Sequence, residues 1–213
     1  MKKQFLTIIL FGSFCTLLAQ TSFNNEVAKS KLEVYVIPKL GFSKITETEN
    51  VPLNGYSNGY DALIAISMKK KFRFSTGISY FEINGNRNLA GGSASLKNLY
   101  LQIPLNINCD FPLSKNIPEN QMVFLSIGIG GYANDFINQQ IETISETTSL
   151  NNLGWNFGFK SQFGLKFLVT KKMNLGIGFE NQIDLSQVKS DNIKYKTVSS
   201  SVYFSVGYRL NRN

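Results

Sequence analysis

The sequence predicts an all-β fold, namely an eight-stranded antiparallel transmembrane up-and-down β-barrel. Three observations predict it: eight runs of alternating polarity, an apolar register in each run that carries no charge, and connections that alternate between long and short. Alternation with a period of two residues is typical of a strand whose two faces meet different surroundings. No stretch of comparable length follows the helical period, so strands are expected to build the whole domain.

The N-terminus is expected to be a secretory signal peptide. Lys2 and Lys3 give a basic start, and an apolar run extends from Phe5 to Leu18. This run is too short for a comfortable membrane-spanning helix, so cleavage near Gln20 is favoured over an uncleaved N-terminal anchor. The chain is therefore divided into a signal peptide (1–20), a short periplasmic N-terminal segment (21–31) and an outer-membrane β-barrel domain (32–213).

The eight runs place their charges and most of their glycines in one register and their large apolar residues in the other. They cover residues 32–43, 60–68, 71–81, 98–111, 122–133, 153–169, 173–185 and 199–210. A soluble barrel of the lipocalin kind would turn the apolar register inward, whereas a membrane barrel turns it toward lipid.

Three features favour the membrane barrel over the soluble one. Most runs reach the roughly nine to eleven residues that a tilted strand needs to cross a bilayer. The polar register is rich in Gly, Ser, Asn and Gln, as in a crowded barrel interior. Aromatic residues such as Phe42, Tyr80, Trp155 and Tyr208 fall toward the ends of runs, where membrane barrels carry aromatic girdles.

The connections between the runs alternate in length. In an antiparallel meander this places every long connection at one end and both termini at the other, as in barrels with short periplasmic turns and long extracellular loops. Four extracellular loops are therefore predicted, at residues 44–59, 84–95, 134–152 and 186–197.

Several of these runs resemble the strands of the PorT-like outer-membrane β-barrel proteins. "YLQIPLNINCDF" (100–111) is similar to a central strand of that family, and "FLSIGIGGYA" (124–133) to the glycine-rich strand that follows it. The runs "NFGFKSQFGLKF" (156–167) and "SVYFSVGYRL" (201–210) resemble its sixth and final strands. The resemblance implies the outer membrane of a Gram-negative bacterium and an accessory role in a protein secretion apparatus.

The end of the chain departs from the pattern of such barrels, which usually finish on an aromatic residue read by the barrel-insertion machinery. Here the last run ends at Leu210, and Tyr208 is the nearest aromatic candidate.

Six charged residues of the polar register form the candidate site. They are Lys39, Arg73, Lys160, Lys166, Glu180 and Asp184. An eight-stranded barrel is just wide enough for side chains, and buried charges must be paired, so these groups are expected to form a structural plug rather than a substrate path. The expected pairs are Lys160 with Glu180, and Lys166 with Asp184 or Glu180.

Pro104 is the second singled-out feature, because it stands in the inward register between Gln102 and Asn106. Proline has no N–H to donate to a strand ladder, and a closed barrel has no edge to place it on. A strand kink, as a bulge or a local bend, is therefore expected at Pro104.

Composition excludes several kinds of site. The chain has no histidine, and Cys109 is the sole cysteine after signal cleavage. We therefore expect no catalytic residues, no metal site, no cofactor and no disulfide. The formal charge of +8 comes from scattered lysines, which does not favour nucleic-acid binding.

The sequence thus predicts a non-enzymatic envelope protein, structural or binding, that acts through its extracellular loops. Expected partners are outer-membrane lipid, the barrel-insertion machinery, and an extracellular ligand or a secretion-system protein. Two alternatives stay open: a PorT-like accessory component of a secretion apparatus, and a narrow channel for small solutes.

Overall fold

The computed structural model describes residues 31–47, 53–68, 71–89, 92–113, 122–143, 147–190 and 193–210. The predicted signal peptide and all but the last residue of the predicted periplasmic segment lie outside these ranges. Lys31, the last residue of that segment, begins the first strand.

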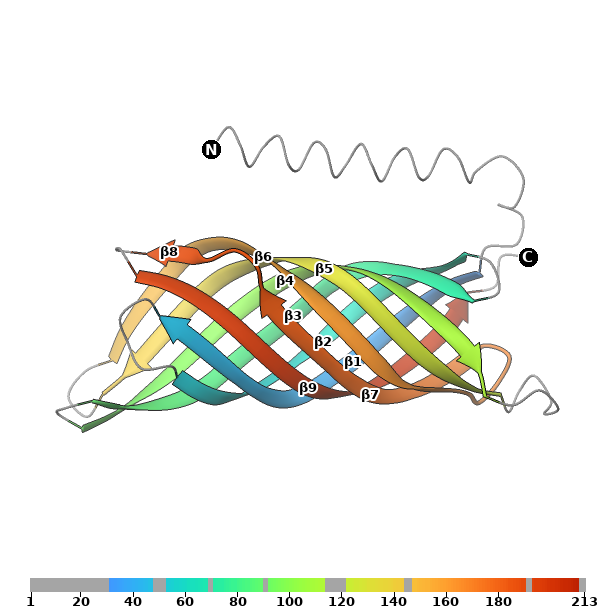
Figure 1. Cartoon of the computed structure of the whole chain (residues 1–213), viewed down its shortest axis with the longest axis horizontal. Coiled ribbons are helices and arrows are strands. Elements are labelled where there is room, and N and C mark those ends of the chain that lie inside the picture. Colours follow the sequence, from blue (N-terminus) through green and yellow to red (C-terminus); the bar gives the residue numbers. More distant parts are fainter. Residues whose placement is uncertain are drawn as a thin grey trace, which may run out of the picture. The chain divides into compact units, whose positions relative to one another are not determined.

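The described residues form one antiparallel sheet that closes on itself (Figure 1). The strands are β1 (Lys31–Glu47), β2 (Leu53–Met68), β3 (Phe72–Leu89), β4 (Gly92–Pro112), β5 (Val123–Glu142), β6 (Thr147–Leu168), β7 (Met173–Asp184), β8 (Val188–Ser190) and β9 (Ile193–Leu210). Each long strand pairs with the next along the chain, and β1 pairs with β9 to close the ring. The three-residue β8 pairs with the start of β9 only. The predicted eight-stranded up-and-down barrel is confirmed, with β8 as an addition at its rim.

The two ends of the barrel differ. Leu32 at the start of β1 lies opposite Leu210 at the finish of β9, so this end, called the terminal end, holds the beginning and the end of the barrel. The turns between β2 and β3, β4 and β5, and β6 and β7 also lie there. The connections between β1 and β2, β3 and β4, β5 and β6, and β7 and β9 join strand ends at the opposite end, as the alternation of lengths predicts; β8 is part of the last of them.

The four predicted long loops are mostly strand, and this part of the prediction is wrong. β1 continues to Glu47, β3 to Leu89 and β5 to Glu142, well inside the segments predicted as loops. Their backbones pair with neighbouring strands; Gly85, for example, pairs with both Gly55 and Leu96. The strands are therefore longer than the runs that the alternation identified, and they extend into the segments predicted as loops.

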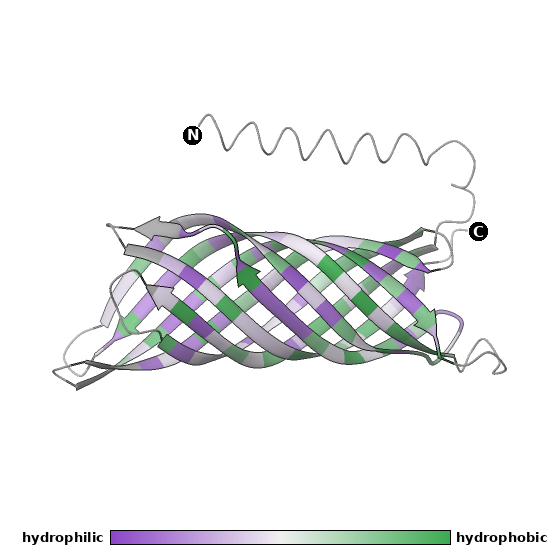
Figure 2. Cartoon of the chain, in the orientation of Figure 1, coloured by the Kyte–Doolittle hydropathy of each residue, from purple (hydrophilic) through white to green (hydrophobic). Residues whose placement is uncertain are grey.

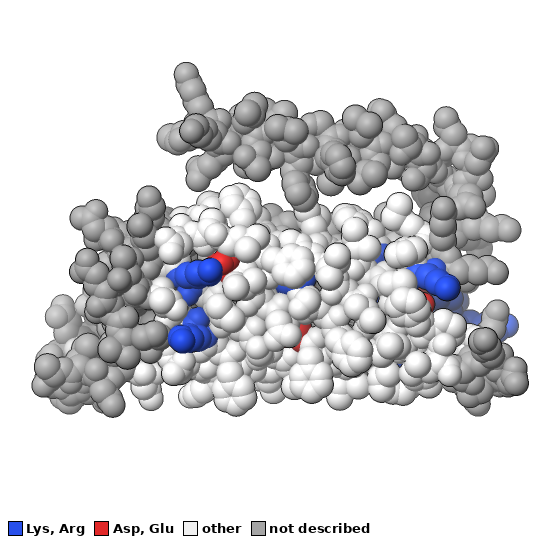
Figure 3. Space-filling view, viewed as in Figure 1, with Lys and Arg blue, Asp and Glu red and all other residues white. Residues whose placement is uncertain are grey.

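The outside of the barrel carries a belt of exposed apolar side chains. Members from all around the ring include Leu40, Ile64, Ile78, Ile103, Ile129, Phe163, Phe179 and Phe204. Figure 2 shows hydrophobic and hydrophilic residues alternating along the strands, and the middle of the face in Figure 3 is almost free of charge. Roughly ten residues of strand at a tilt of about 40° span about 25 Å, the height of a transmembrane apolar band. Among the described residues, no helix is long and apolar enough to cross a membrane.

Polarity inverts above the belt, in a region that we call the collar (residues 44–47, 53–58, 82–89, 92–98, 135–143, 147–154 and 193–197). Its described outward side chains are mostly polar, such as Lys44, Asn86 and Lys97, whereas inward ones such as Ile45 and Ile83 are fully buried. A strand with water outside and an apolar core inside shows this pattern. The collar is therefore built like a soluble barrel and is continuous with the part of the barrel that carries the belt.

The junction of belt and collar is marked by an irregularity in β5 and β6. The register of these strands shifts between Phe136 and Asn138. Opposite this shift, Gly154 has a φ of 110°, a left-handed conformation that glycine adopts without steric cost. The shift lets both strands bend where their surroundings change.

Pro104 lies in the inward register and is buried. Between β3 and β4, Thr76 pairs with Leu105 and Ser79 pairs with Gln102, whereas the two residue pairs in between are missing from the ladder. The register is the same on both sides, so no residue is inserted. Of the two forms of kink expected at Pro104, the bulge is absent, and the ladder to β3 is interrupted there. A local bend at Pro104 stays a prediction.

Candidate functional site

A cluster of four charges occupies the middle of the lumen. Lys39 of β1 lies 2.7 Å from Asp61 of β2 and 2.6 Å from Glu180 of β7. Lys160 of β6 lies 3.3 Å from Glu180 and 3.8 Å from Asp61. All four side chains are at most 3% exposed. Two cations and two carboxylates balance, which is what burial of charge requires.

Amide side chains complete the surroundings of Glu180. Gln162 and Gln182 each donate a hydrogen bond to its carboxylate. Gln102, on the far side of the lumen, donates to Gln182 at 3.2 Å. The predicted pair of Lys160 with Glu180 therefore forms, within a larger network.

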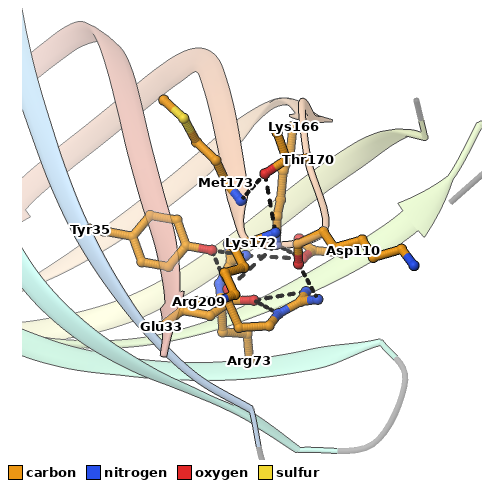
Figure 4. Close-up of polar contacts among 10 residues, drawn as sticks. Glu33, Tyr35, Arg73, Asp110, Lys166, Thr170, Lys172, Met173 and Arg209 are labelled. Carbon is orange, nitrogen blue, oxygen red and sulfur yellow. Dashed lines mark hydrogen bonds and ion pairs between the residues drawn. The ribbon is translucent and has the colours of Figure 1, made fainter. Parts of the chain in front are cut away.

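A second cluster fills the lumen at the terminal end (Figure 4). Asp110 lies 3.0 Å from both Arg73 and Lys166. Glu33 lies 3.1 Å from Arg209 and 3.8 Å from Lys166. Figure 4 shows these side chains converging from separate strands. The cluster ties β1, β3, β4, β6 and β9 together across the lumen.

Tyr35 links Glu33 to Arg73 within this cluster. Its hydroxyl donates to Glu33 and accepts a hydrogen bond from Arg73 at 2.9 Å. The guanidinium carbon of Arg73 also lies 4.9 Å from the centre of the Tyr35 ring, within the range of a cation–π contact.

The expected partners of Lys166 were wrong. Lys166 pairs with Asp110 and Glu33, whereas Asp184 lies farther along the barrel and accepts hydrogen bonds from Tyr132 and from the backbone N–H of Thr197. Register explains the difference, because Lys166 lies opposite Gly176, four residues from Glu180 toward the terminal end.

The six predicted site residues all lie buried in the lumen. The predicted set omits three of their partners, Glu33, Asp61 and Asp110, and also Arg209, which pairs with Glu33. The signal that could have found them is the same inward register. What the sequence does not contain is which strands face each other across the lumen.

Apolar clusters separate and cap the charged layers. Inward residues along β1 are in turn Glu33, Tyr35, Ile37, Lys39, Ser43 and Ile45, so charge and apolar packing alternate along the axis. One apolar cluster lies between the charged layers and contains Tyr35, Ile37, Leu63, Ala65 and Tyr203. The other fills the collar and contains Ile45, Leu53, Phe81, Ile83, Leu96, Tyr100, Phe136 and Tyr195. In it the rings of Tyr100 and Phe136 stack with centres 4.5 Å apart.

A small cavity remains beside the terminal-end cluster, with a volume of about 40 Å³. Arg73, Lys166 and Tyr203 contribute to its lining. This volume has room for about three water molecules. No group of three or more His, Cys, Asp or Glu residues within the described ranges is arranged to hold a metal ion.

Comparison with known proteins gives likenesses of fold only. No protein-family model and no curated protein matches the chain, so the PorT-like resemblance has no support from either comparison. The solved structure of Neisserial surface protein A is 13% identical, with a TM-score of 0.46 over 81% of this chain and 96% of that chain. The N-terminal β-barrel domain of Pseudomonas aeruginosa OprF is 10% identical, with a TM-score of 0.42 over 82% and 97%.

A third likeness is to the outer membrane protease OmpT from Escherichia coli, at 6% identity and a TM-score of 0.41 over 85% of this chain and 96% of that chain. At such identities and scores, nothing about the activity of the present chain follows from any of these neighbours.

Proposed function

We propose that this protein is a non-enzymatic outer-membrane protein of a Gram-negative bacterium. Its barrel is sealed, and it works at the cell surface through the collar and the connections above it. Lipid of the outer membrane surrounds the belt, and the barrel-insertion machinery assembles the chain, with Tyr208 as the aromatic residue nearest the end of the last strand.

The filled lumen carries this proposal. Two charged clusters and two apolar clusters occupy the described interior, and the cavity beside them holds only about 40 Å³. A hydrated solute needs a continuous polar path, which a layer such as the collar core opposes. The role as a narrow solute channel is therefore the weaker alternative.

The state of the buried carboxylates supports a non-enzymatic role. Glu180 and Asp110 each contact two cations, and Asp184 is held by Tyr132 and a backbone N–H. A catalytic carboxylate needs access to a substrate in a cleft. Groups committed to internal pairs are better suited to stabilising the barrel.

Cysteine labelling tests whether the protein lies in the outer membrane and whether the collar faces the outside of the cell. In a background with C15S and C109S, Gln140→Cys puts a thiol on the exposed collar, and Lys171→Cys puts one at the exposed terminal end. A polymer-linked maleimide too large for porins should label Q140C on intact cells, and K171C only after the outer membrane is permeabilised. Labelling of K171C alone on intact cells would invert the orientation, and recovery of unlabelled protein in the soluble fraction would refute the placement.

Conductance tests the sealed lumen. Refolded protein inserted into a planar bilayer should give no stable single-channel steps, whereas a porin inserted under the same conditions does. Regular steps from the pure protein would favour the channel alternative.

The accessory role implied by the PorT-like resemblance shares the same barrel but places a partner protein at one of its ends. Deleting the gene would then impair export of other proteins. Unchanged secretion in the deletion strain would leave the surface role as the function.

A further inference from the structure

We propose that the outer wall formed by β9, β1 and β2 binds a lipid with a phosphorylated headgroup, which it holds at the junction of belt and collar through Lys44 and Lys196. This site depends on the proposed outer-membrane placement only for its biological occupant, because binding itself is measurable in detergent.

A groove of about 510 Å³ lies in this wall. It is lined by Phe42, Ser43, Lys44, Asn54, Gly55, Tyr56, Val198 and Ser200. Phe42 and Tyr56 are 78% and 64% exposed. Phe42 has the highest exposure among the large hydrophobic side chains of the described residues, so it gains more than any of them from a covering acyl chain.

Two lysines stand at the collar edge of this groove. In the pairing of β1 with β9, Lys44 lies opposite Val198 and Lys196 lies opposite Thr46. The lysines are thus diagonal neighbours on the outward face, with backbone positions roughly 7–8 Å apart. Neither makes an ion pair with a described residue, so one phosphate group can face both.

The charge of this sector is one-sided. On the outward face of β9, β1 and the collar part of β2, the described side chains include no carboxylate. Outward acids of the collar lie elsewhere, with Glu82 on β3 and Glu142 on β5. Lys97, a collar lysine outside the sector, lies 3.2 Å from Glu82 and is already neutralised. Among the described side chains of the collar, the lysines without an ion pair, Lys44 and Lys196, therefore both lie beside the groove.

The height of the site on the barrel favours a lipid over a soluble anion. Lys44 follows directly on the apolar outward series of β1, which ends in Leu40 and Phe42, both highly exposed. A phosphate at the lysines would have its acyl chains lying along these side chains, at the depth where the headgroups of that leaflet begin. Lys44 is exposed and Lys196 is half-buried. Such lysines alone add little to the binding of a free anion, whereas burial of apolar surface adds to the binding of an amphiphile.

Native mass spectrometry of the full-length protein in detergent tests the site. The probes are bisphosphorylated lipid A and the same glycolipid with both phosphates removed. The wild type should retain the phosphorylated form, and K44Q/K196Q should lose about tenfold in affinity, since each lysine near an anionic headgroup contributes modestly. K97Q is the matched control and should bind like the wild type, because its lysine already has a partner.

Four results would overturn the proposal: equal retention of the dephosphorylated lipid, equal loss in K97Q, no loss in K44Q/K196Q, or displacement of the lipid by millimolar inorganic phosphate. The single variants K44Q and K196Q, each with an intermediate loss expected, provide the measurement should the double variant not fold. Failure of the surface-labelling test with lipid binding intact would refute the outer-membrane placement and leave the site standing.

Discussion

Glu180 shows how a charge is accommodated at the centre of this lumen. Its carboxylate accepts hydrogen bonds from Lys39, Lys160, Gln162 and Gln182, and it is 1% exposed. A buried carboxylate with two cations and two amide donors has nearly all its lone pairs satisfied. Removing its charge would leave two buried ammonium groups facing Asp61 alone.

Glu180→Gln should therefore lower the stability of the barrel by about 3–5 kcal/mol, the usual effect of breaking a buried ion pair from one side. The measurement is the urea midpoint of unfolding in lipid vesicles. Glu142→Gln, an exposed collar carboxylate, is the control and should leave the midpoint unchanged. A second comparison uses E180L and the double variant K39M/E180L. The double variant should lose less stability than E180L, because it removes a cation together with the anion. Equal midpoints for E180Q and the wild type would contradict this account.

Close packing between neighbouring strands is the feature that matters at the scale of elements. Gly158 of β6 lies opposite Tyr132 of β5, and the Tyr132 ring lies where a Cβ on Gly158 would be. The Tyr132 hydroxyl reaches Asp184 at 2.8 Å. The glycine thus leaves space for the Tyr132 ring to lie across β6 and reach Asp184 on β7.

Gly158→Ala should displace Tyr132, weaken its hydrogen bond to Asp184 and destabilise the barrel by about 1–3 kcal/mol. Gly131→Ala is the matched control, since a Cβ there meets only the Gly158 carbonyl at 3.6 Å, an ordinary contact. The temperature at which the fast-migrating unboiled gel band disappears should fall for G158A and stay constant for G131A. A fall of the same size in both variants would show that the loss of a glycine from a strand, and not the displacement of the Tyr132 ring, lowers the stability.

The strands were predictable from sequence where their outer face carries the apolar belt. There the apolar register is continuous, as from Leu32 to Phe42, and the pattern also gives the correct inward direction of the charges. The collar was missed because polarity inverts there. In the collar the apolar Ile45 faces inward and the charged Lys44 faces outward, whereas in the belt apolar residues face outward and charged residues face inward. The lumen pairs of Lys166 were missed because alternation describes one strand at a time, whereas Asp110 reaches Lys166 from β4, with β5 between them.

The whole molecule combines two barrels of opposite polarity on one set of strands. In the outer-membrane placement proposed above, lipid stabilises the belt, whereas the collar depends on its own core, in which Phe136 is 1% exposed and contacts Tyr100 and Tyr195. These parts are expected to open separately, because different solvents stabilise them.

Phe136→Ala should leave a cavity and destabilise the collar locally by about 3–5 kcal/mol, with little effect on the belt. Hydrogen exchange in micelles should then become faster in residues 135–142 of β5 and stay slow in 123–133. Phe159→Ala is the control, because Phe159 faces outward and leaves no internal cavity. Faster exchange over all of β5 in F136A would show that the two parts unfold as one unit.

The pairing of β1 with β9 determines when this chain can fold. Glu33 and Arg209 join across that seam although 176 positions separate them. Until the last strand arrives, β1 exposes an unpaired edge, and the entropy of closing so long a loop opposes early ring formation. Contacts this distant in sequence give slow folding. The barrel can therefore close only at the final step of folding, when β9 meets β1. In the outer-membrane placement proposed above, the chain would reach the membrane with the two edges of its sheet still apart.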